Sequence, residues 1–253
     1  MEIPANSQDR MRSILILVAT IGTIVFNGLA ATGYVNGVTP EMISDRYPTV
    51  LTPAGYAFSI WSLIYAGLIA FSIFQLLPRN LVRFRSIRSL YVFSCVLNCS
   101  WIYFWHREQI GVCLGLIFAL LVTLIVILIQ FARSQTEGGA IFTKGVFGIY
   151  AGWVTAATLV NFGVLLKSME LIASPTSWNL LGAAFIMLAA SMAVLVRFKL
   201  NNYLFPLAVA WASTAIAVKQ SGNTVIVVAA SFCVIVCLVM AVSFVMNQKS
   251  TTT

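Results

Sequence analysis

The sequence has few charged residues for its length. Only 9% of its 253 residues are Asp, Glu, Lys or Arg, while 60% are hydrophobic, and the mean hydropathy is +0.95. Apolar runs of about 18 residues or more recur along the chain, which predicts a polytopic α-helical membrane protein. The runs are continuous and do not alternate with polar residues, so the pattern excludes a transmembrane β-barrel.

Ionisable side chains are also missing from the apolar runs that are expected to cross the membrane. Proton-coupled transporters, pumps and voltage sensors keep such groups at mid-membrane because their mechanisms need them. Paired aspartates for intramembrane proteolysis and His/Glu clusters for metal chemistry are absent as well. We therefore expect no enzyme activity, no catalytic residue, no metal site and no required cofactor. The lone His106 is expected to be an interfacial residue.

Cysteines lack the spacing of metal-binding or redox motifs. All 5 lie in apolar runs, and they are expected to be small packing residues. Two pairs, Cys95/Cys99 and Cys233/Cys237, are four residues apart and would stack on helix faces. Low-complexity tracts and long linkers are missing too, so we predict a single membrane domain over residues 1–253 and no soluble domain.

We predict eight membrane-spanning helices in an all-α bundle. At about 1.5 Å per residue each would cover roughly the 30 Å hydrocarbon core, the shorter ones only marginally. Residues 1–12 are expected to be a polar tail and residues 36–56 a proline-containing loop. The first apolar run is too long for a signal peptide and is expected to be retained. The predicted spans are 13–34, 57–77, 90–105, 110–132, 145–166, 178–196, 203–218 and 224–246.

Eight spans place both termini on one side of the membrane. Of the 15 Lys and Arg residues, eleven fall on that side, which places both termini in the cytoplasm or its equivalent, at a bacterial inner membrane or an organelle membrane. This orientation also accounts for the net charge of +8, so the lipid bilayer and not nucleic acid is the expected partner. The eleven are Arg10, Arg12, Arg79, Arg83, Arg85, Arg88, Arg133, Lys144, Arg197, Lys199 and Lys249, and the other four are Arg46, Arg107, Lys167 and Lys219.

Aromatic and amide side chains stand inside the spans in place of charge. Pro53 suits the first turn of a helix, and Trp61 and Tyr65 then share one helix face. The turn is either the rim of a pocket or a helix start with an interfacial aromatic belt. Asn98 and Asn161 should face the bundle interior, because an unpaired amide in lipid is costly. Two roles stay open for them: interhelical hydrogen bonding, or orienting a flat hydrophobic ligand in an aromatic cavity.

The order and spacing of these residues resemble the tryptophan-rich sensory protein family, also called the translocator protein or peripheral benzodiazepine receptor family. That family carries W-x-x-x-Y on its second helix, L-N-x-x-W on its third and P-Y-x-x-W on its fifth, with L-N eight residues past the last Trp. The resemblance covers about residues 13–167 and implies a five-helix core, to which residues 178–246 would add a three-helix extension. The matching residues are Trp61 and Tyr65, Leu97, Asn98 and Trp101, and Tyr150, Trp153 and Asn161.

The sequence departs from the family pattern mainly near the first loop and on the fifth helix. Thr52 stands where the first proline of the loop pair is expected, and the loop tryptophan, which would fall near Val50, is missing. Ile149 replaces the proline before Tyr150. These departures concern the ligand and any photochemistry more than the fold.

The resemblance implies that porphyrins, or other flat lipophiles such as sterols, bind in a pocket inside the bundle under the first loop as a lid. Ala157 would be the small residue that allows close approach of the ligand or of a partner helix. A homodimer or a larger membrane complex is the implied assembly. The implied ligand-binding residues are Trp61, Tyr65, Asn98, Trp101, Trp153, Ala157 and Asn161, and the implied lid residues are Pro48, Pro53 and Tyr56.

We therefore expect a membrane receptor or sensor for a porphyrin-like, tetrapyrrole-like or sterol-like molecule, with a regulatory or transport role. One alternative is a carrier that moves a lipophilic small molecule without proton coupling, since eight helices leave more room for alternating access than five. Another is an accessory subunit of a larger membrane complex, because small residues in the last three spans suit close helix packing. Those small residues include Gly182, Ala183, Ala184, Ala189, Ala190 and Ser191.

Overall fold

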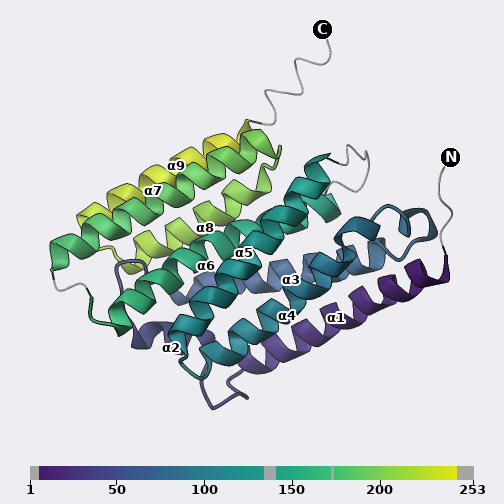
Figure 1. Ribbon diagram of the computed structural model, residues 1–253. Coiled ribbons are helices and arrows are strands. Elements are labelled where there is room, and N and C mark those ends of the chain that lie inside the picture. The colour runs from purple at the N-terminus through teal and green to yellow at the C-terminus, as the bar shows by residue number, and fades with distance from the viewer. Residues whose placement is uncertain (1–5, 134–140, 172–173, 244–253) are drawn as a thin grey trace, which may run out of the picture. The chain divides into compact units, whose positions relative to one another are not determined.

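A computed structural model of the chain describes residues 6–133, 141–171 and 174–243 (Figure 1). The described residues form helices and the turns between them, with no β-strand, which confirms the predicted all-α fold class. Some parts of the predictions lie outside the described residues: residues 1–5 of the predicted polar tail, residues 134–140 between the fourth and fifth predicted spans, residues 244–246 of the predicted last span, and Lys249.

The helical elements follow the predicted apolar runs closely, with short turns between them. In chain order they are α1 (Ser7–Ala31), α2 (Pro40–Arg46), η1 (Gly55–Ser59), α3 (Ile60–Phe74), η2 (Pro78–Asn80), η3 (Arg85–Ile87), α4 (Arg88–Trp105), α5 (Ile110–Arg133), η4 (Ile141–Gly145), α6 (Val146–Ser168), α7 (Pro175–Lys199), α8 (Leu204–Lys219) and α9 (Thr224–Val242).

Within the described residues, 7 helical segments are long and apolar enough to cross a membrane. The remaining apolar helix, α8, has 16 residues and lies at the predicted span 203–218. The chain is thus an integral membrane protein of the polytopic helical type. The 7 segments are Ser7–Ala31, Gly55–Phe74, Arg85–Trp105, Ile110–Arg133, Phe142–Ser168, Pro175–Lys199 and Thr224–Val242.

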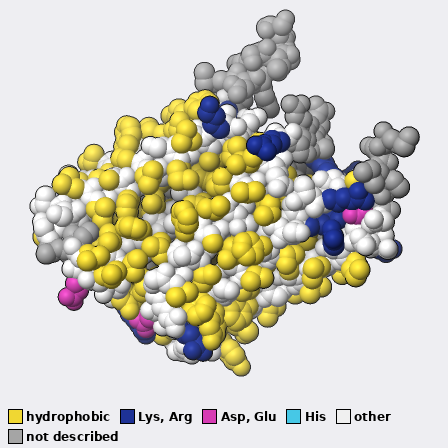
Figure 2. Space-filling model, viewed as in Figure 1, with side chains coloured by type: hydrophobic (Ala, Val, Ile, Leu, Met, Phe, Trp, Pro, Cys, Tyr) yellow, Lys and Arg dark blue, Asp and Glu magenta, His cyan; other side chains and the backbone are white. Residues whose placement is uncertain are grey.

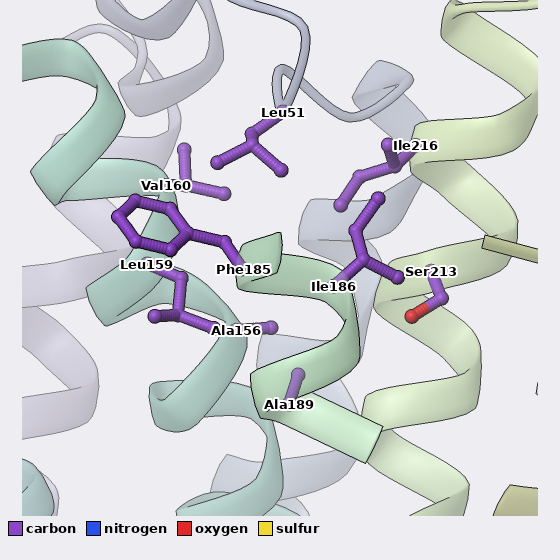
Figure 3. Close-up of a pocket in the computed structure, with 9 residues that line it drawn as sticks. All are labelled: Leu51, Ala156, Leu159, Val160, Phe185, Ile186, Ala189, Ser213 and Ile216. Carbon is purple, nitrogen blue, oxygen red and sulfur yellow. The ribbon is translucent and has the colours of Figure 1, made fainter. Parts of the chain in front are cut away.

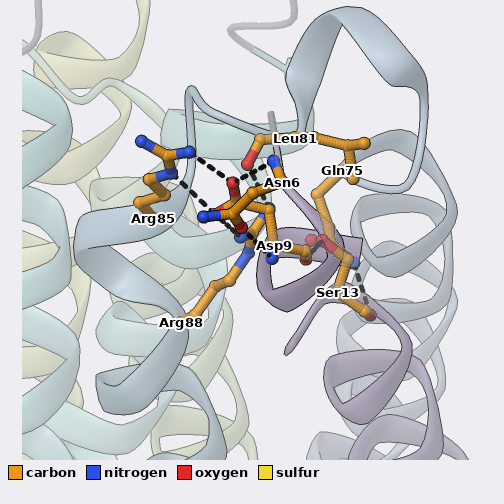
Figure 4. Close-up of polar contacts among 7 residues, drawn as sticks. All are labelled: Asn6, Asp9, Ser13, Gln75, Leu81, Arg85 and Arg88. Carbon is orange, nitrogen blue, oxygen red and sulfur yellow. Dashed lines mark hydrogen bonds and ion pairs between the residues drawn. The ribbon is translucent and has the colours of Figure 1, made fainter. Parts of the chain in front are cut away.

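The first helix begins at Ser7, so the prediction of a polar tail through Arg12 is wrong for residues 7–12. The physical reason is a capping box: the Asn6 side chain accepts a hydrogen bond from Asp9 N, and the Asp9 side chain accepts one from Asn6 N. The helix therefore starts with a polar turn, in which Asp9 also meets Arg85 (Figure 4).

The predicted loop over residues 36–56 contains a short helix, α2, which the sequence analysis does not predict. Pro40 occupies the first helical position, where its missing N–H costs no hydrogen bond. A second helical turn, η1, precedes α3 and begins the predicted second span.

The chain forms two compact units, and the first loop belongs to the second of them. Unit 1 comprises Met1–Pro40 and Trp61–Phe147, and unit 2 comprises Glu41–Ile60 and Gly148–Thr253. Unit 1 therefore holds α1, α3, α4 and α5, while unit 2 holds the first-loop segment, most of α6, and α7 to α9.

In unit 1, α4 packs against α1 and against α5 (Figure 1). Phe71 on α3 lies in its core, with ring centroids 5.6 Å from Tyr91 and 5.0 Å from Phe147. The Thr20 hydroxyl on α1 lies 2.7 Å from Ser72 Oγ and 2.5 Å from Tyr91 OH. Hydroxyl contacts of this kind hold membrane helices together because the lipid offers no competing partner.

In unit 2, α9 packs against both α7 and α8 (Figure 1). Small side chains allow this close approach. Gly182, Ala189 and Ala190, which the sequence analysis considered for contacts with a larger complex, are buried within the unit. The other buried alanines of α7 to α9 are Ala193, Ala208, Ala210, Ala212, Ala215, Ala230 and Ala241.

The surface of the long helices is largely apolar. Figure 2 shows hydrophobic side chains over much of the visible face, with Lys and Arg side chains near its edges. Examples of exposed side chains are Val18 at 58%, Phe118 at 57% and Phe232 at 52%. Soluble monomers rarely expose apolar surface this extensive, whereas lipid tails cover it without cost.

Candidate ligand-binding site

Four aromatic rings of α3 and α4 form one cluster in unit 1, which we call the aromatic cluster: Trp61, Tyr65, Trp101 and Trp105. The rings of Trp61 and Tyr65 stack, with centroids 5.4 Å apart and an interplanar angle of 19°. Trp61 lies 6.5 Å from Trp101, which stacks on Trp105 at 5.7 Å. Rings at these separations attract one another and present flat apolar faces.

Helix geometry explains both stacked pairs. Each pair is four residues apart, which places its members one turn from each other on the same helix face. Trp101 and Trp105 are 4% and 2% exposed. Trp105 is an aromatic residue within the predicted third span but is not among the ligand-binding residues that the resemblance implies, although its spacing from Trp101 is a sufficient signal. Its Nε1 donates to Pro40 O at 3.1 Å, which fixes the indole against the start of the first loop.

Asn98 lies next to the aromatic cluster and is 0% exposed, which confirms that it faces the interior. Asn27 Nδ2 on α1 donates to Asn98 Oδ1 at 2.7 Å. Asn98 thus joins α1 to α4 and places an amide beside the rings. The criterion that selected Asn98, an amide within an apolar run, would have selected Asn27 as well.

The Asn27–Asn98 hydrogen bond is expected to stabilise unit 1. Asn27→Leu should lower the free energy of unfolding by about 1–2 kcal/mol, because Asn98 Oδ1 loses a buried donor. Asn98→Leu should cost a similar amount. The double variant should lose clearly less than the sum of the two, as measured by denaturation in detergent micelles. Strictly additive losses would show that the two amides do not interact.

The predicted residues on α6 belong to unit 2. Trp153 is 4% exposed, and its ring lies edge-on to Phe58 with centroids 6.1 Å apart. Asn161 is 3% exposed, as expected for an interior amide, and its Nδ2 donates to Ala157 O at 2.9 Å. Ala157 is half-buried. The seven predicted ligand-binding residues are therefore divided, with Trp61, Tyr65, Asn98 and Trp101 together in unit 1.

The segment predicted to act as a lid is attached to α8. Ala54 N donates to Ala215 O at 2.9 Å, and Trp211 Nε1 donates to Ala57 O at 3.0 Å. The Tyr56 ring packs edge-on against Trp211, with centroids 5.3 Å apart. Any lid movement of this segment would have to break these contacts.

A second set of contacts holds the same loop nearer its middle. Gln220 Nε2, just after α8, donates to Thr49 O at 3.0 Å. Of the predicted lid residues, Pro53 is buried and Pro48 is exposed. α8 and the turn that follows it thus hold the first loop.

A small apolar cavity lies within unit 2 between α6, α7 and α8 (Figure 3). Its volume is about 20 Å³, room for a single water molecule and far too little for a flat lipophile. Ser213 supplies the one hydroxyl in the lining, and it donates to Cys233 Sγ at 3.2 Å. The other lining residues are Leu51, Ala156, Leu159, Val160, Phe185, Ile186, Ala189 and Ile216.

The cysteines and His106 occupy structural positions. All five cysteines are free thiols, and Cys233 and Cys237 lie one turn apart on α9 with their sulfurs 4.0 Å from each other.

His106 is 5% exposed, and its Nδ1 lies 2.8 Å from Ile102 O. In the part of the chain that the structure describes, no group of three His, Cys, Asp or Glu side chains could hold a metal ion.

Comparison with known proteins gives a family for the chain. A search of curated proteins found no match, and neither did a search of solved structures. A family model described as TSPO-like protein matches residues 13–243. This match reaches beyond residues 13–167, where the motifs resemble the family, and includes α7, α8 and α9. With its helical membrane architecture and a family match over most of its length, the chain belongs to the TSPO-like protein family.

Proposed function

We propose that the protein is a non-enzymatic membrane receptor or sensor for a flat lipophilic ligand of the porphyrin or sterol type. The observation that carries the proposal is the aromatic cluster in unit 1, with the Asn98 amide beside it. Membership of the TSPO-like family supports it, and Trp61, Tyr65 and Trp101 of the cluster are residues through which the sequence resembles that family.

The chemistry of the cluster suits such a ligand. Indole and phenol rings bind a flat ring system by stacking and by burying its apolar surface. Asn98 offers an amide, and Tyr65 a hydroxyl, to a polar edge of the ligand. Discrimination would then come from the shape of the stack and from these few polar groups, as in other small-molecule sites.

We also propose an orientation with both termini on the cytoplasmic side. The distribution of Lys and Arg supports it, since the loops after the second, fourth and sixth predicted spans are the basic ones. The orientation requires α8 to cross the bilayer with 16 residues, a length of about 24 Å. Local thinning of the bilayer accommodates a short span at modest cost.

Porphyrin binding tests the proposal. Trp61→Leu and Trp101→Leu should each raise the Kd for a porphyrin about fivefold, because each removes one stacking surface worth about 1 kcal/mol. The measurement is the shift of porphyrin absorbance during titration of the detergent-purified protein. This readout does not depend on the protein's own tryptophan fluorescence.

The matched control is Phe232→Leu on α9, in unit 2, which removes an aromatic ring that is 52% exposed and should leave porphyrin affinity within twofold of the unaltered protein. Equal, non-saturating absorbance changes in all variants would mean that the porphyrin only partitions into micelles. Weakening in Phe232→Leu equal to that in Trp61→Leu and Trp101→Leu would mean that the loss of any aromatic ring lowers the affinity. Either result would refute a site at the aromatic cluster.

An uncoupled carrier is the second candidate. The observation that favours it is the division of the membrane helices into two compact units, because carriers commonly work by rocking one helical bundle against another. Saturable porphyrin flux into proteoliposomes, independent of a proton gradient, would support a carrier. Saturable binding without flux would support the receptor.

A further inference from the structure

An open cleft lies at the end of unit 2 that carries the first loop and the turn between α8 and α9. Its volume is about 540 Å³, within the range of about 300–1,000 Å³ typical of small-molecule sites. It shares no residue with the aromatic cluster. The described residues that line it are Pro48, Thr49, Val50, Lys167, Pro175, Trp178, Asn179, Gln220 and Asn223.

The lining of the cleft carries a positive charge and no negative one. Lys167, near the end of α6, is its cation, and no Asp or Glu is among the described lining residues. The Lys167 ammonium forms no hydrogen bond or ion pair with any described residue. Lys219 differs in this respect, because it forms an ion pair with Asp45 at 3.1 Å. The Lys167 ammonium is thus available to a ligand.

Two helices begin at the cleft. Pro175 is the first residue of α7, which has 25 residues. Asn223 is the N-cap of α9, which has 19 residues, and its side chain accepts from Ile226 N. The N-terminal end of a helix carries a partial positive charge, so both helices add to the field of Lys167 in favouring an anion.

Amide groups in the cleft are arranged as donors. Asn223 Nδ2 donates to Asn179 Oδ1 at 2.7 Å, which fixes the orientation of the Asn179 amide. The side-chain nitrogen Nδ2 of Asn179 has no acceptor among the residues described here, although the side chain is half-buried. Beside it, the half-buried Trp178 presents an indole to the same cleft.

We propose that this cleft binds the phosphate or carboxylate group of an amphipathic ligand. Lys167, the Asn179 amide and the two helix N-termini bind the anion, while Trp178, Val50 and Pro175 contact the apolar part of the ligand. The ligand reaches the cleft from the bilayer, as an anionic phospholipid, or from solution, as a small phosphate or carboxylate. The proposal does not depend on porphyrin binding.

The test uses the full-length protein in an uncharged detergent and two probes, phenyl phosphate and short-chain phosphatidylglycerol. Binding is measured by isothermal titration calorimetry. Lys167→Gln should raise the Kd of the probe that binds about tenfold, whereas Lys167→Arg should stay within threefold because it keeps the charge. The control is Arg107→Gln in unit 1, which changes the net charge equally and should leave the Kd within twofold.

The two probes distinguish the sources of the ligand. Saturable binding of phosphatidylglycerol alone identifies a lipid from the bilayer, binding of phenyl phosphate alone identifies a soluble ligand, and binding of both supports the shared anion chemistry. Absence of saturable binding for both probes overturns the proposal. An equal rise of the Kd in Lys167→Gln and Arg107→Gln also overturns the proposal, because it would reflect the net charge of the protein only. Unchanged thermal unfolding of the exposed Lys167 variants will show that they fold.

Discussion

Replacing Gly152 by alanine is expected to lower the free energy of unfolding by about 1–3 kcal/mol. A Cβ at Gly152 on α6 would lie 2.4 Å from Phe205 O and 3.0 Å from Ala208 Cβ, both on α8. A backbone carbonyl cannot rotate away as a side chain can, so α6 and α8 would have to separate. Denaturation in detergent micelles will measure the loss.

The same substitution at Gly115 is the matched control. Gly115 lies within α5, and a Cβ added there would meet no atom within 4 Å. Alanine is more favourable than glycine in a helix by about 1 kcal/mol, so Gly115→Ala should be neutral or stabilising. If both variants lost stability equally, the close approach of α6 and α8 would not be the cause.

Gly152 also shows what the sequence could and could not predict. Its neighbours Tyr150 and Trp153 were selected by the spacing of the family motif, and the helix itself by its apolar run. The partner of the helix was not predictable from this pattern. In a membrane both the lipid-facing and the buried faces of a helix are apolar, so periodicity does not show which face packs inside.

The aromatic cluster was more accessible to sequence analysis. Trp61 with Tyr65 and Trp101 with Trp105 stack because four residues make about one helical turn, which depends on the helix alone. The pairing of Asn98 with Asn27 required the arrangement of α1 against α4. That arrangement depends on tertiary packing. The single sequence indicates only that a buried amide needs a partner, not which helix supplies it.

The attachment of the first loop to α8 could not be predicted. The bond from Ala54 N to Ala215 O joins two backbone groups, which every residue except proline carries. Even the bond from Trp211 Nε1 uses a backbone acceptor, Ala57 O. Only the fold brings these segments together, and the family resemblance implies a lid without indicating its attachment to α8.

The sequence analysis assigns Asp9 to a polar tail and does not predict its role in joining α1 to η3 and α4. Its side chain is 6% exposed and accepts from Arg85 Nε at 2.6 Å and from Arg88 Nη1 at 3.3 Å (Figure 4). The signal was present, because Asn6 and Asp9 have the spacing of a capping box. Arg85 and Arg88 were considered only for the orientation of the chain, yet they bind α1 to η3 and α4.

Asp9→Asn is expected to be among the most destabilising single substitutions. Asparagine keeps the size of the side chain and its capping acceptor but removes the charge. The Arg88 side chain is 3% exposed, and a buried guanidinium that loses its carboxylate partner destabilises a protein by about 3 kcal/mol. Leu81 O still accepts a hydrogen bond from Arg88, which satisfies one donor but does not balance the charge. Thermal unfolding in detergent will measure the effect.

Asp45→Asn provides the control, because it removes a carboxylate from an exposed ion pair. Asp45 and Lys219 have side chains 43% and 42% exposed, and such pairs contribute less than about 1 kcal/mol. Arg88→Met, combined with Asp9→Asn, should recover part of the stability, since no buried charge then remains. If Asp9→Asn lost no more stability than Asp45→Asn, the Asp9 carboxylate would be solvated, and the link between α1 and α4 would have to rest on Asn27, Thr20 and their partners.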